Sequence, residues 1–524
     1  MLTFLKKSLF SALTLVIILL VSACSMLPTN FEHIDSHAFT NTEQTLLGKM
    51  ATKIQAGETE NSTMYLIEEG TDAFLTRMVL LSMAERSVDV QYYIWKSDII
   101  GKLLMSKMLE VADRGVRVRL LLDDLSLDDK TKSILFAMDH HENIDVRIYN
   151  PFSSGSYKAP AALADTARIN RRMHNKSFTV DNQYTIVGGR NIEENYFSAN
   201  VTSNYTDIGM LSVGPVVSDV STQFDLYFNS PLAIPGNAFD KHESYKNSLD
   251  QVKKELSDYV ISIQDSDYAH DLRNSTLYQR IINGLSGHYE NLAYRGKAHV
   301  IYDNPKKTLG KSELEVTYTI SMLGSHTDKI ENSLELISPY FVPGDEGTQH
   351  LTSMVESGIK VRVITNSLAS TDGILAQSGY ARQRYNLLKG GIELYEQKPK
   401  AKSKASRSLS RSAKAKSALH AKIYIFDRKE VYIGSFNFDP RSAQINTELG
   451  VVCEVPAMAE YIATGLFDKN IKEFAYKVVL EDDEVVWLDT EDGQVTRHTS
   501  QPETSAWRRF NLNLYSLFPI ESQL

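Results

Sequence analysis

The sequence predicts an α/β protein of two homologous domains, each a mixed β-sheet flanked by helices. Two observations lead to this class. A motif that begins at His174 recurs at His420, 246 residues later, with every internal spacing kept. Alternating strand-like and helix-like segments recur at nearly the same offset, and a repeat of this length indicates two domains rather than a solenoid. We expect the domains to pack face to face with pseudo-twofold symmetry.

The predicted elements follow one another in the same order in both copies. Strands are expected where β-branched and aliphatic residues are frequent, and helices where apolar residues recur at helical spacing. Six segments carry the pattern, namely 87–94, 103–114 and 115–122 in the first copy and 333–340, 348–356 and 358–365 in the second.

The chain has 524 residues, more than one hydrophobic core supports. The predicted parts are a signal peptide (1–23), an N-terminal tether (24–60), a first domain (61–235), a helical connection (236–300), a second domain (301–475) and a C-terminal extension (476–524). The tail from Glu481 to Leu524, which contains Trp487, Trp507 and Tyr515, is expected to pack on the second domain, with contact with lipid as the alternative.

One predicted loop has no counterpart in the first copy. A flexible basic insertion is expected at 397–419, because Lys398 to Lys416 holds eight Lys and Arg residues among Ser and Ala, with no acid. Two interpretations stay open, a solvated segment without a role and a segment attracted to anionic headgroups.

The N-terminus is predicted to be a targeting segment. Lys6 and Lys7 precede an apolar run that is too short for an ordinary membrane span. The sequence from Val21 to Cys24 resembles the lipobox of bacterial lipoproteins, although an ordinary signal peptide with a chance cysteine is the alternative. The resemblance implies acylation of Cys24 and a lipid-anchored protein of the cell envelope that faces the periplasm. Ser25 favours the outer membrane over the inner one.

Charge and cysteine content exclude other roles. The net charge of −9 argues against a protein that coats nucleic acid nonspecifically, so no nucleic-acid partner is expected. Cys453 lies in an apolar run, which predicts a buried, inert thiol. The sequence shows no cluster of metal ligands, so we predict no cofactor and activity without divalent ions.

The repeated motif brings together groups that handle phosphate. In a strand, side chains two residues apart share a face, so His174 and Lys176 are expected to point the same way, as are His420 and Lys422. A turn follows each pair, at Asp181 in the first copy and at Asp427 in the second. We expect each Asp to fix its turn rather than touch substrate.

Gly188 and Gly189 after the first turn, and Gly434 after the second, let the backbone approach a ligand closely. Asn191 and Asn437, at the ends of the two motifs, can each donate an amide hydrogen bond to a phosphoryl oxygen. Arg190 stands where the second copy has Phe436, and it is expected to contact either a headgroup or an acidic neighbour.

Each copy alone offers one histidine, whereas phosphoryl transfer through a covalent intermediate needs a nucleophile and a separate acid. Two facing copies supply both. The nucleophilic imidazole must be neutral while its partner is protonated, so we expect their surroundings to separate their pKa values. Asp207 and Glu448 are candidates to orient the imidazoles, with ordinary surface acids as the alternative.

The paired His-Lys-Asp motifs resemble the phospholipase D superfamily over about residues 61–475. Further fragments resemble the bacterial cardiolipin synthase branch, in particular its C-type, and they are residues 91–95, 149–152, 171–176 and 518–521. The resemblance implies that His174, Lys176, Asp181, His420, Lys422 and Asp427 form the catalytic motifs. It also implies a phosphatidyl-histidine intermediate, with His174 as nucleophile and His420 as acid and base.

The implied substrates are phospholipids, namely phosphatidylglycerol with phosphatidylethanolamine as a further candidate. Transfer to a lipid hydroxyl would give cardiolipin, whereas transfer to water would give phosphatidic acid, and both use the same residues. A nucleic-acid phosphodiesterase is disfavoured by the lipobox and the acidity of the chain. A catalytically inactive lipid binder is disfavoured because both motifs keep His and Lys.

Overall fold

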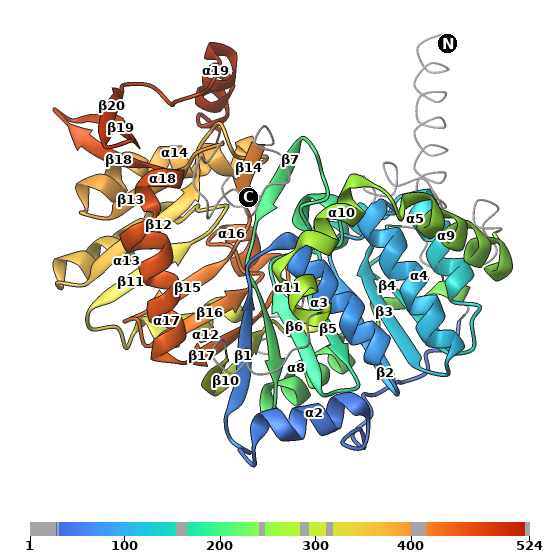
Figure 1. Ribbon diagram of the computed structural model, residues 1–524. Coiled ribbons are helices and arrows are strands. Elements are labelled where there is room, and N and C mark those ends of the chain that lie inside the picture. The colour runs from blue at the N-terminus through green and yellow to red at the C-terminus, as the bar shows by residue number, and fades with distance from the viewer. Residues whose placement is uncertain are drawn as a thin grey trace, which may run out of the picture.

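Eighteen strands of the described chain join into one mixed sheet (Figure 1). The computed structural model describes residue 28 and residues 31–152, 165–239, 247–282, 293–310, 318–399 and 416–518. The predicted signal peptide, Cys24 and most of the basic insertion lie outside the described residues, and so do residues 519–521 of the fourth fragment that resembles cardiolipin synthases.

Each half of the sheet contains eight strands. The first half contains β1 (Ser62–Ile67), β2 (Ser87–Tyr92), β3 (Arg117–Asp123), β4 (Ile144–Tyr149), β5 (Ser177–Val180), β6 (Tyr184–Gly188), β8 (Gly209–Val213) and β9 (Ala233–Pro235). The second contains β10 (Tyr294–Tyr302), β11 (Ser333–Ile337), β12 (Lys360–Asn366), β13 (Glu393–Gln397), β15 (Ile423–Phe426), β16 (Glu430–Gly434), β17 (Leu449–Glu454) and β18 (Ala475–Glu481). The strands β19 (Glu484–Glu491) and β20 (Gln494–His498) extend its outer edge, and β7 (Ser203–Thr206) pairs separately with β14 (Lys416–Leu419).

The helices have the following bounds. The first half has α2 (Leu46–Gln55), α3 (Gly70–Met83), α4 (Ile99–Asp113), α5 (Asp129–Met138), α7 (Thr166–Ile169) and α8 (Pro215–Phe228). The connection has α9 (Leu249–Ile263), α10 (Asp267–Asn274) and α11 (Thr276–Ile282). The second half has α12 (Thr319–Thr327), α13 (Gly344–Glu356), α14 (Ile374–Lys389), α16 (Pro440–Gln444), α17 (Pro456–Ala463), α18 (Ile471–Phe474) and, at its end, α19 (Ala506–Tyr515).

The strand order repeats outward from a central pair. Antiparallel pairing of β1 with β10 joins the halves, and Ser62 lies opposite Gly296 there. From β1 the order runs β8, β6, β5, β2, β3, β4, β9, and from β10 it runs β17, β16, β15, β11, β12, β13, β18. Every strand of one half therefore has a counterpart in the other, which confirms the predicted fold class of two similar mixed α/β domains.

A buried ion pair marks the repeat between neighbouring parallel strands. Asp89 on β2 faces Arg119 on β3, with Nε 2.7 Å from Oδ1. At the equivalent place Arg362 on β12 donates to Glu335 on β11 over 2.7 Å. Buried charges persist when a partner and hydrogen bonds compensate their desolvation, which these pairs provide.

A shared core holds the halves together. Ile433 and Val451 of the second half pack with Val187 and Met210 of the first in one cluster of buried residues. Cys453 belongs to this cluster, and burial raises the pKa of its thiol, as expected for an inert cysteine. The functional residues lie beside this core, so the sheet contacts that stabilise the fold also align the two motifs.

The C-terminal extension packs only in part. Trp487 on β19 is buried and donates to Glu396, as predicted. Trp507 on α19 is 69% exposed, although Arg508 of the same helix donates to the carbonyls of Leu368 and Thr371 in the second domain. Within the described residues, no helix is both long and apolar enough to cross a bilayer.

Candidate active site

His174 and Lys176 lie in an extended segment directly before β5, and His420 and Lys422 lie in one directly before β15. We expected both pairs inside strands. Each strand begins one residue after its lysine, because the backbone at each histidine bonds instead to the opposite half of the molecule. The amide of His174 donates to the carbonyl of Thr447 over 2.8 Å, and that of His420 donates to Thr206 over 2.8 Å.

Each imidazole is held by a carboxylate from the opposite half. His174 Nδ1 lies 2.8 Å from Glu448 Oε2, and His420 Nδ1 lies 2.7 Å from Asp207 Oδ2. The structure thus brings both candidate carboxylates to the imidazoles and shows that the pairing crosses between the halves. All four side chains are buried. Each half therefore supplies one imidazole and the carboxylate for the other, so neither half forms a site alone.

The two carboxylates differ in acidity. Burial raises the pKa of Glu448 to about 7. Burial acts in the same direction on Asp207, but the hydrogen bond to His420 and the charges of Arg190 and Lys422 outweigh it and lower the pKa of Asp207 below its ordinary value. Asp207 is therefore ionised over a wider pH range than Glu448.

The pKa values of both imidazoles are shifted in the same direction, below the ordinary value. Burial, followed by the charges of Lys176 and Lys422, holds the pKa of His174 well below its ordinary value. Burial and the Lys422 ammonium also lower the pKa of His420. The expected separation of the histidine pKa values is not what distinguishes the two half-sites, since both rings are buried beside ammonium groups. The contrast lies in the carboxylates behind them.

The two lysines bring buried positive charge to the site. Lys176 and Lys422 each donate to the backbone carbonyl of the histidine in their own motif. Burial lowers the pKa of Lys422 to about 8 and that of Lys176 well below its ordinary value. A desolvated ammonium interacts strongly with an entering phosphate anion, because little water screens it.

Aromatic rings that we did not predict line both imidazoles. Tyr93 meets His174 edge to face with ring centroids 4.9 Å apart, and Tyr196 meets His420 in the same way at 4.8 Å. The Tyr196 hydroxyl lies 3.3 Å from His420 Nε2 and accepts a hydrogen bond from Asn191 Nδ2 over 2.9 Å. Because it accepts from Asn191, the hydroxyl can turn its own hydrogen toward His420.

The two motif asparagines lie in different surroundings. Asn191 reaches His420 through Tyr196, so one of its amide hydrogens is already used. Asn437 is buried, and its Oδ1 has no hydrogen-bond partner among the described residues. Ser435, two residues before Asn437, donates through Oγ to Glu448, a contact that the motif alone did not suggest. Direct binding of phosphate by the asparagines stays a prediction.

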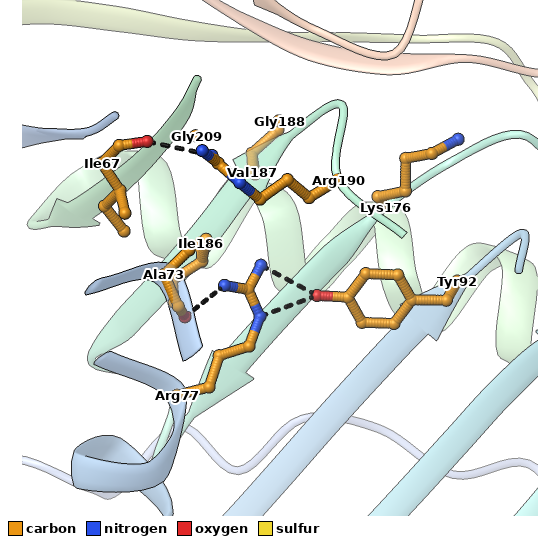
Figure 2. A pocket seen from close by; sticks show the side chains of 10 residues that line it. All are labelled: Ile67, Ala73, Arg77, Tyr92, Lys176, Ile186, Val187, Gly188, Arg190 and Gly209. Carbon is orange, nitrogen blue, oxygen red and sulfur yellow. Dashed lines mark hydrogen bonds between the residues drawn. The ribbon is translucent and has the colours of Figure 1, made fainter. Parts of the chain in front are cut away.

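Arg190 forms its hydrogen bonds with backbone carbonyls, and its charge also acts on the carboxylate of Asp207. Its guanidinium donates to the carbonyls of Ile67, Glu68 and Tyr196 over 2.9, 2.6 and 3.2 Å. Figure 2 shows this group on one wall of a small cavity, with Arg77 on another wall and Lys176 at its side. Burial lowers the pKa of Arg190 to about 10. Since these bonds and its burial tie it to the protein, Arg190 positions the backbone near Asp207.

The motif aspartates lie at the turns and accept hydrogen bonds from backbone amides. Asp181 accepts hydrogen bonds from the amides of Glu85, Arg86 and Ser87, with Oδ1 2.7 Å from Arg86 N. Asp427 binds the amides of residues 331–333 in the same way. Both residues have positive φ, 51° and 52°, which Asp tolerates better than most residues. Each aspartate joins a turn to the start of a neighbouring strand.

Replacement of Asp181 by Ala is expected to lower stability far more than catalysis. Three backbone amides would lose their acceptor, which should cost about 2–4 kcal/mol of unfolding free energy. Urea unfolding measures this, with Asp258→Ala as control, because the Asp258–Lys254 pair is exposed and contributes little. Unchanged stability with a loss of turnover like that of a histidine variant would instead place Asp181 in the chemistry.

The described residues contain no group of three or more His, Cys, Asp or Glu side chains arranged to hold a metal ion. Two buried lysines, Lys176 and Lys422, bring positive charge to the site. Activity without divalent ions stays a prediction.

Two homologous halves that each contribute an imidazole, an ammonium and the other half's carboxylate define a phosphatidyltransferase of the phospholipase D type. Comparison with known proteins gives the family. A family model described as "Cardiolipin synthase, PLD-like domain" matches residues 78–226 and 326–468, and the chain belongs to this family.

Two relatives support the assignment, and one solved structure shows a similar fold. Cardiolipin synthase C of Escherichia coli (strain K12) is 37% identical over 469 residues, which cover 87% of this chain and 95% of that protein. An uncharacterized protein of Helicobacter pylori (strain J99) is 32% identical over 471 residues, covering 89% and 90%. The crystal structure of phosphatidylserine synthase from Haemophilus influenzae Rd KW20 has a TM-score of 0.53 at 12% identity, covering 91% and 99%, and shows a similar fold. The predicted superfamily and its cardiolipin synthase branch are confirmed.

Proposed function

We propose that this protein is a membrane-associated cardiolipin synthase that moves a phosphatidyl group between phospholipids through a covalent phosphatidyl-histidine. The crossed pairs His174–Glu448 and His420–Asp207 carry the proposal, because they hold two imidazoles in one buried site with Nδ1 of each bound to a carboxylate. Nε2 of His174 is then available for nucleophilic attack, and Nε2 of His420, which lies 3.3 Å from the Tyr196 hydroxyl, for proton transfer.

His174 is the proposed nucleophile. Its Nε2 attacks the phosphorus of the donor lipid, the bond to the departing alcohol oxygen breaks, and His420 gives that oxygen a proton. The carboxylates support this division. The ionised Asp207 carboxylate opposes the lowering of the His420 pKa and so stabilises the imidazolium when His420 carries the proton, whereas Glu448 can accept the Nδ1 hydrogen of a neutral His174 once it is ionised.

The second step reverses the roles of the groups. His420 takes a proton from the hydroxyl of an acceptor lipid, the hydroxyl oxygen attacks phosphorus, and the phosphorus–nitrogen bond to His174 breaks. Lys176 and Lys422 oppose the negative charge that grows on the phosphoryl oxygens in both steps. Water in place of the lipid hydroxyl would release phosphatidic acid, so transfer depends on exclusion of water from the buried site.

The proposed donor is phosphatidylglycerol or phosphatidylethanolamine, and phosphatidylglycerol is the proposed acceptor. Family membership and the printed name of the Escherichia coli relative support this substrate class. Acylation of Cys24, proposed from the sequence Val21 to Cys24, would anchor the enzyme in the cell envelope with its site in the periplasm, and the outer membrane is the favoured location.

One incubation separates the proposed activity from its alternatives. Purified protein is mixed with phosphatidylglycerol vesicles, with and without phosphatidylethanolamine, and the products are read by lipid mass analysis. We expect cardiolipin, formed at a rate that depends on enzyme concentration. Phosphatidic acid as the main product would identify a hydrolytic phospholipase D, and no change in the lipids would contradict both lipid activities.

A further inference from the structure

The C-terminal helix α19 exposes its most apolar face to solvent. Its Trp507, Phe510 and Leu514 are 69%, 54% and 41% exposed and recur at helical spacing. Leu517 and Phe518 continue the same side beyond the helix, at 78% and 53%. The rings of Trp507 and Phe510 stack with centroids 5.4 Å apart, so they form one continuous surface.

Polar and apolar sides of this helix are reversed relative to an ordinary surface helix. Leu512, on the opposite side, is its buried residue, and Arg508 faces the protein as well. Arg508 donates to the carbonyls of Leu368 and Thr371 over 2.8 and 2.7 Å. An amphipathic helix normally buries its apolar stripe against the core, so an outward stripe held in place by an arginine indicates contact with something beyond the described residues.

The loop that binds Arg508 of α19, which includes Leu368 and Thr371, also contacts residues beside the active site. Asp372, next to Thr371, accepts hydrogen bonds from the hydroxyls of Tyr205 and Tyr340 over 2.8 Å each. The centroid of the Tyr205 ring lies 5.4 Å from the centroid of the His420 imidazole. Figure 1 shows α19 on the same side of the molecule as β14, the strand that ends directly before His420.

We infer that the apolar face of α19, formed by Trp507, Phe510, Leu514, Leu517 and Phe518, enters the surface of a lipid bilayer and holds the active site against it. The inference rests on the proposed function, since a phospholipid substrate must come from such a surface. Trp and Phe rings suit the boundary between headgroups and acyl chains, where amphipathic helices insert their apolar side.

A second protein fits this face less well. The exposed parts of the five side chains amount to roughly 600 Å², whereas each partner of a stable complex buries about 800 Å². A bilayer needs no complementary shape, and its substrate lipids would lie beside the loop that carries Asp372. Position and composition of the face therefore both favour a membrane over a second copy of the chain.

Tryptophan fluorescence of the full-length chain tests the inference directly. Trp95 and Trp487 are buried, so Trp507 is the tryptophan that can respond to lipid. A His174→Ala background prevents turnover and separates insertion from chemistry. On vesicles of equal parts phosphatidylglycerol and brominated phosphatidylcholine, we expect a blue shift and bromine quenching that Trp507→Phe removes. No response to vesicles would overturn the inference, and so would a blue shift that appears with protein concentration alone.

Activity gives an independent measurement in the wild-type background. The double variant Trp507→Ser/Phe510→Ser should lower the ratio of turnover on phosphatidylglycerol vesicles to turnover on monomeric dihexanoyl-phosphatidylglycerol by about tenfold. Ile261→Ser on α9, also an exposed apolar residue at 61%, is the matched control and should leave the ratio unchanged. An equal loss on both substrates in the double variant would contradict membrane docking. Insertion of Trp507 without any lipid product in wild type would contradict the proposed function alone.

Discussion

Replacement of either histidine of the two motifs by alanine is expected to abolish turnover. His174→Ala removes the proposed nucleophile and His420→Ala removes the acid, so each should lower kcat by about 10⁴-fold or more. The two losses should not add in the double variant, because each single change already stops the same reaction. Lipid mass analysis of phosphatidylglycerol vesicles measures the effect.

A histidine outside the site provides the control. His326 Nδ1 lies 2.6 Å from Glu430 Oε2 in the second half, a pair of the same kind at the turn end of the β15–β16 hairpin, whereas His420 precedes the opposite end of β15. His326→Ala should retain most of the activity. Substantial turnover in His174→Ala or in His420→Ala would refute a single site built from two halves.

The pattern of the sequence accounts for much of this arrangement. Spacing alone located both His-Lys pairs and identified two similar domains. The strands β2 and β11 are separated by nearly the same number of residues as the two motifs. The turn role expected for Asp181 also follows from local chemistry, since a carboxylate in a turn is well placed to accept backbone amides. Information of this kind is local, so a single sequence contains it.

The cross-pairing of the imidazoles depends on contacts between distant parts of the chain. Glu448 lies 274 residues from His174, and nothing in the sequence states which carboxylate meets which ring. Tyr196 was missed for the same reason, because it belongs to no repeated motif and reaches His420 only in the folded chain. The outward face of α19 could not be predicted either, since periodicity marks an apolar stripe without showing which side meets the protein.

The assembly of the site through the interface has a mechanical consequence. The two halves share the cluster around Ile433 and Val187, and the backbones of His174 and His420 bond across it. A change that separates the halves would break both histidine–carboxylate pairs together. Catalysis is therefore coupled to the packing of the interface more directly than it would be in a site formed within one domain.

The carboxylates behind the imidazoles should control the pH dependence, and Glu448→Gln is the decisive variant. Glu448 must be ionised to accept the Nδ1 hydrogen of His174, and its pKa is about 7. Protonation removes that acceptor, so kcat/KM of the wild type should fall as the pH drops below about 7. Lys422, whose pKa is about 8, loses its charge above that pH, so kcat/KM should also fall as the pH rises above about 8.

Gln at position 448 cannot titrate, so the acidic limb near pH 7 should disappear, while kcat falls by about 10²- to 10⁴-fold because the imidazole loses its charged partner. Asp207→Asn is the matched variant at the other ring. It should lower kcat by a comparable factor but keep the acidic limb, because Asp207 has a lowered pKa and Glu448 is still present. Profiles of kcat/KM against pH for the three proteins measure this. An acidic limb that persists in Glu448→Gln and vanishes in Asp207→Asn would exchange the roles assigned to the two half-sites.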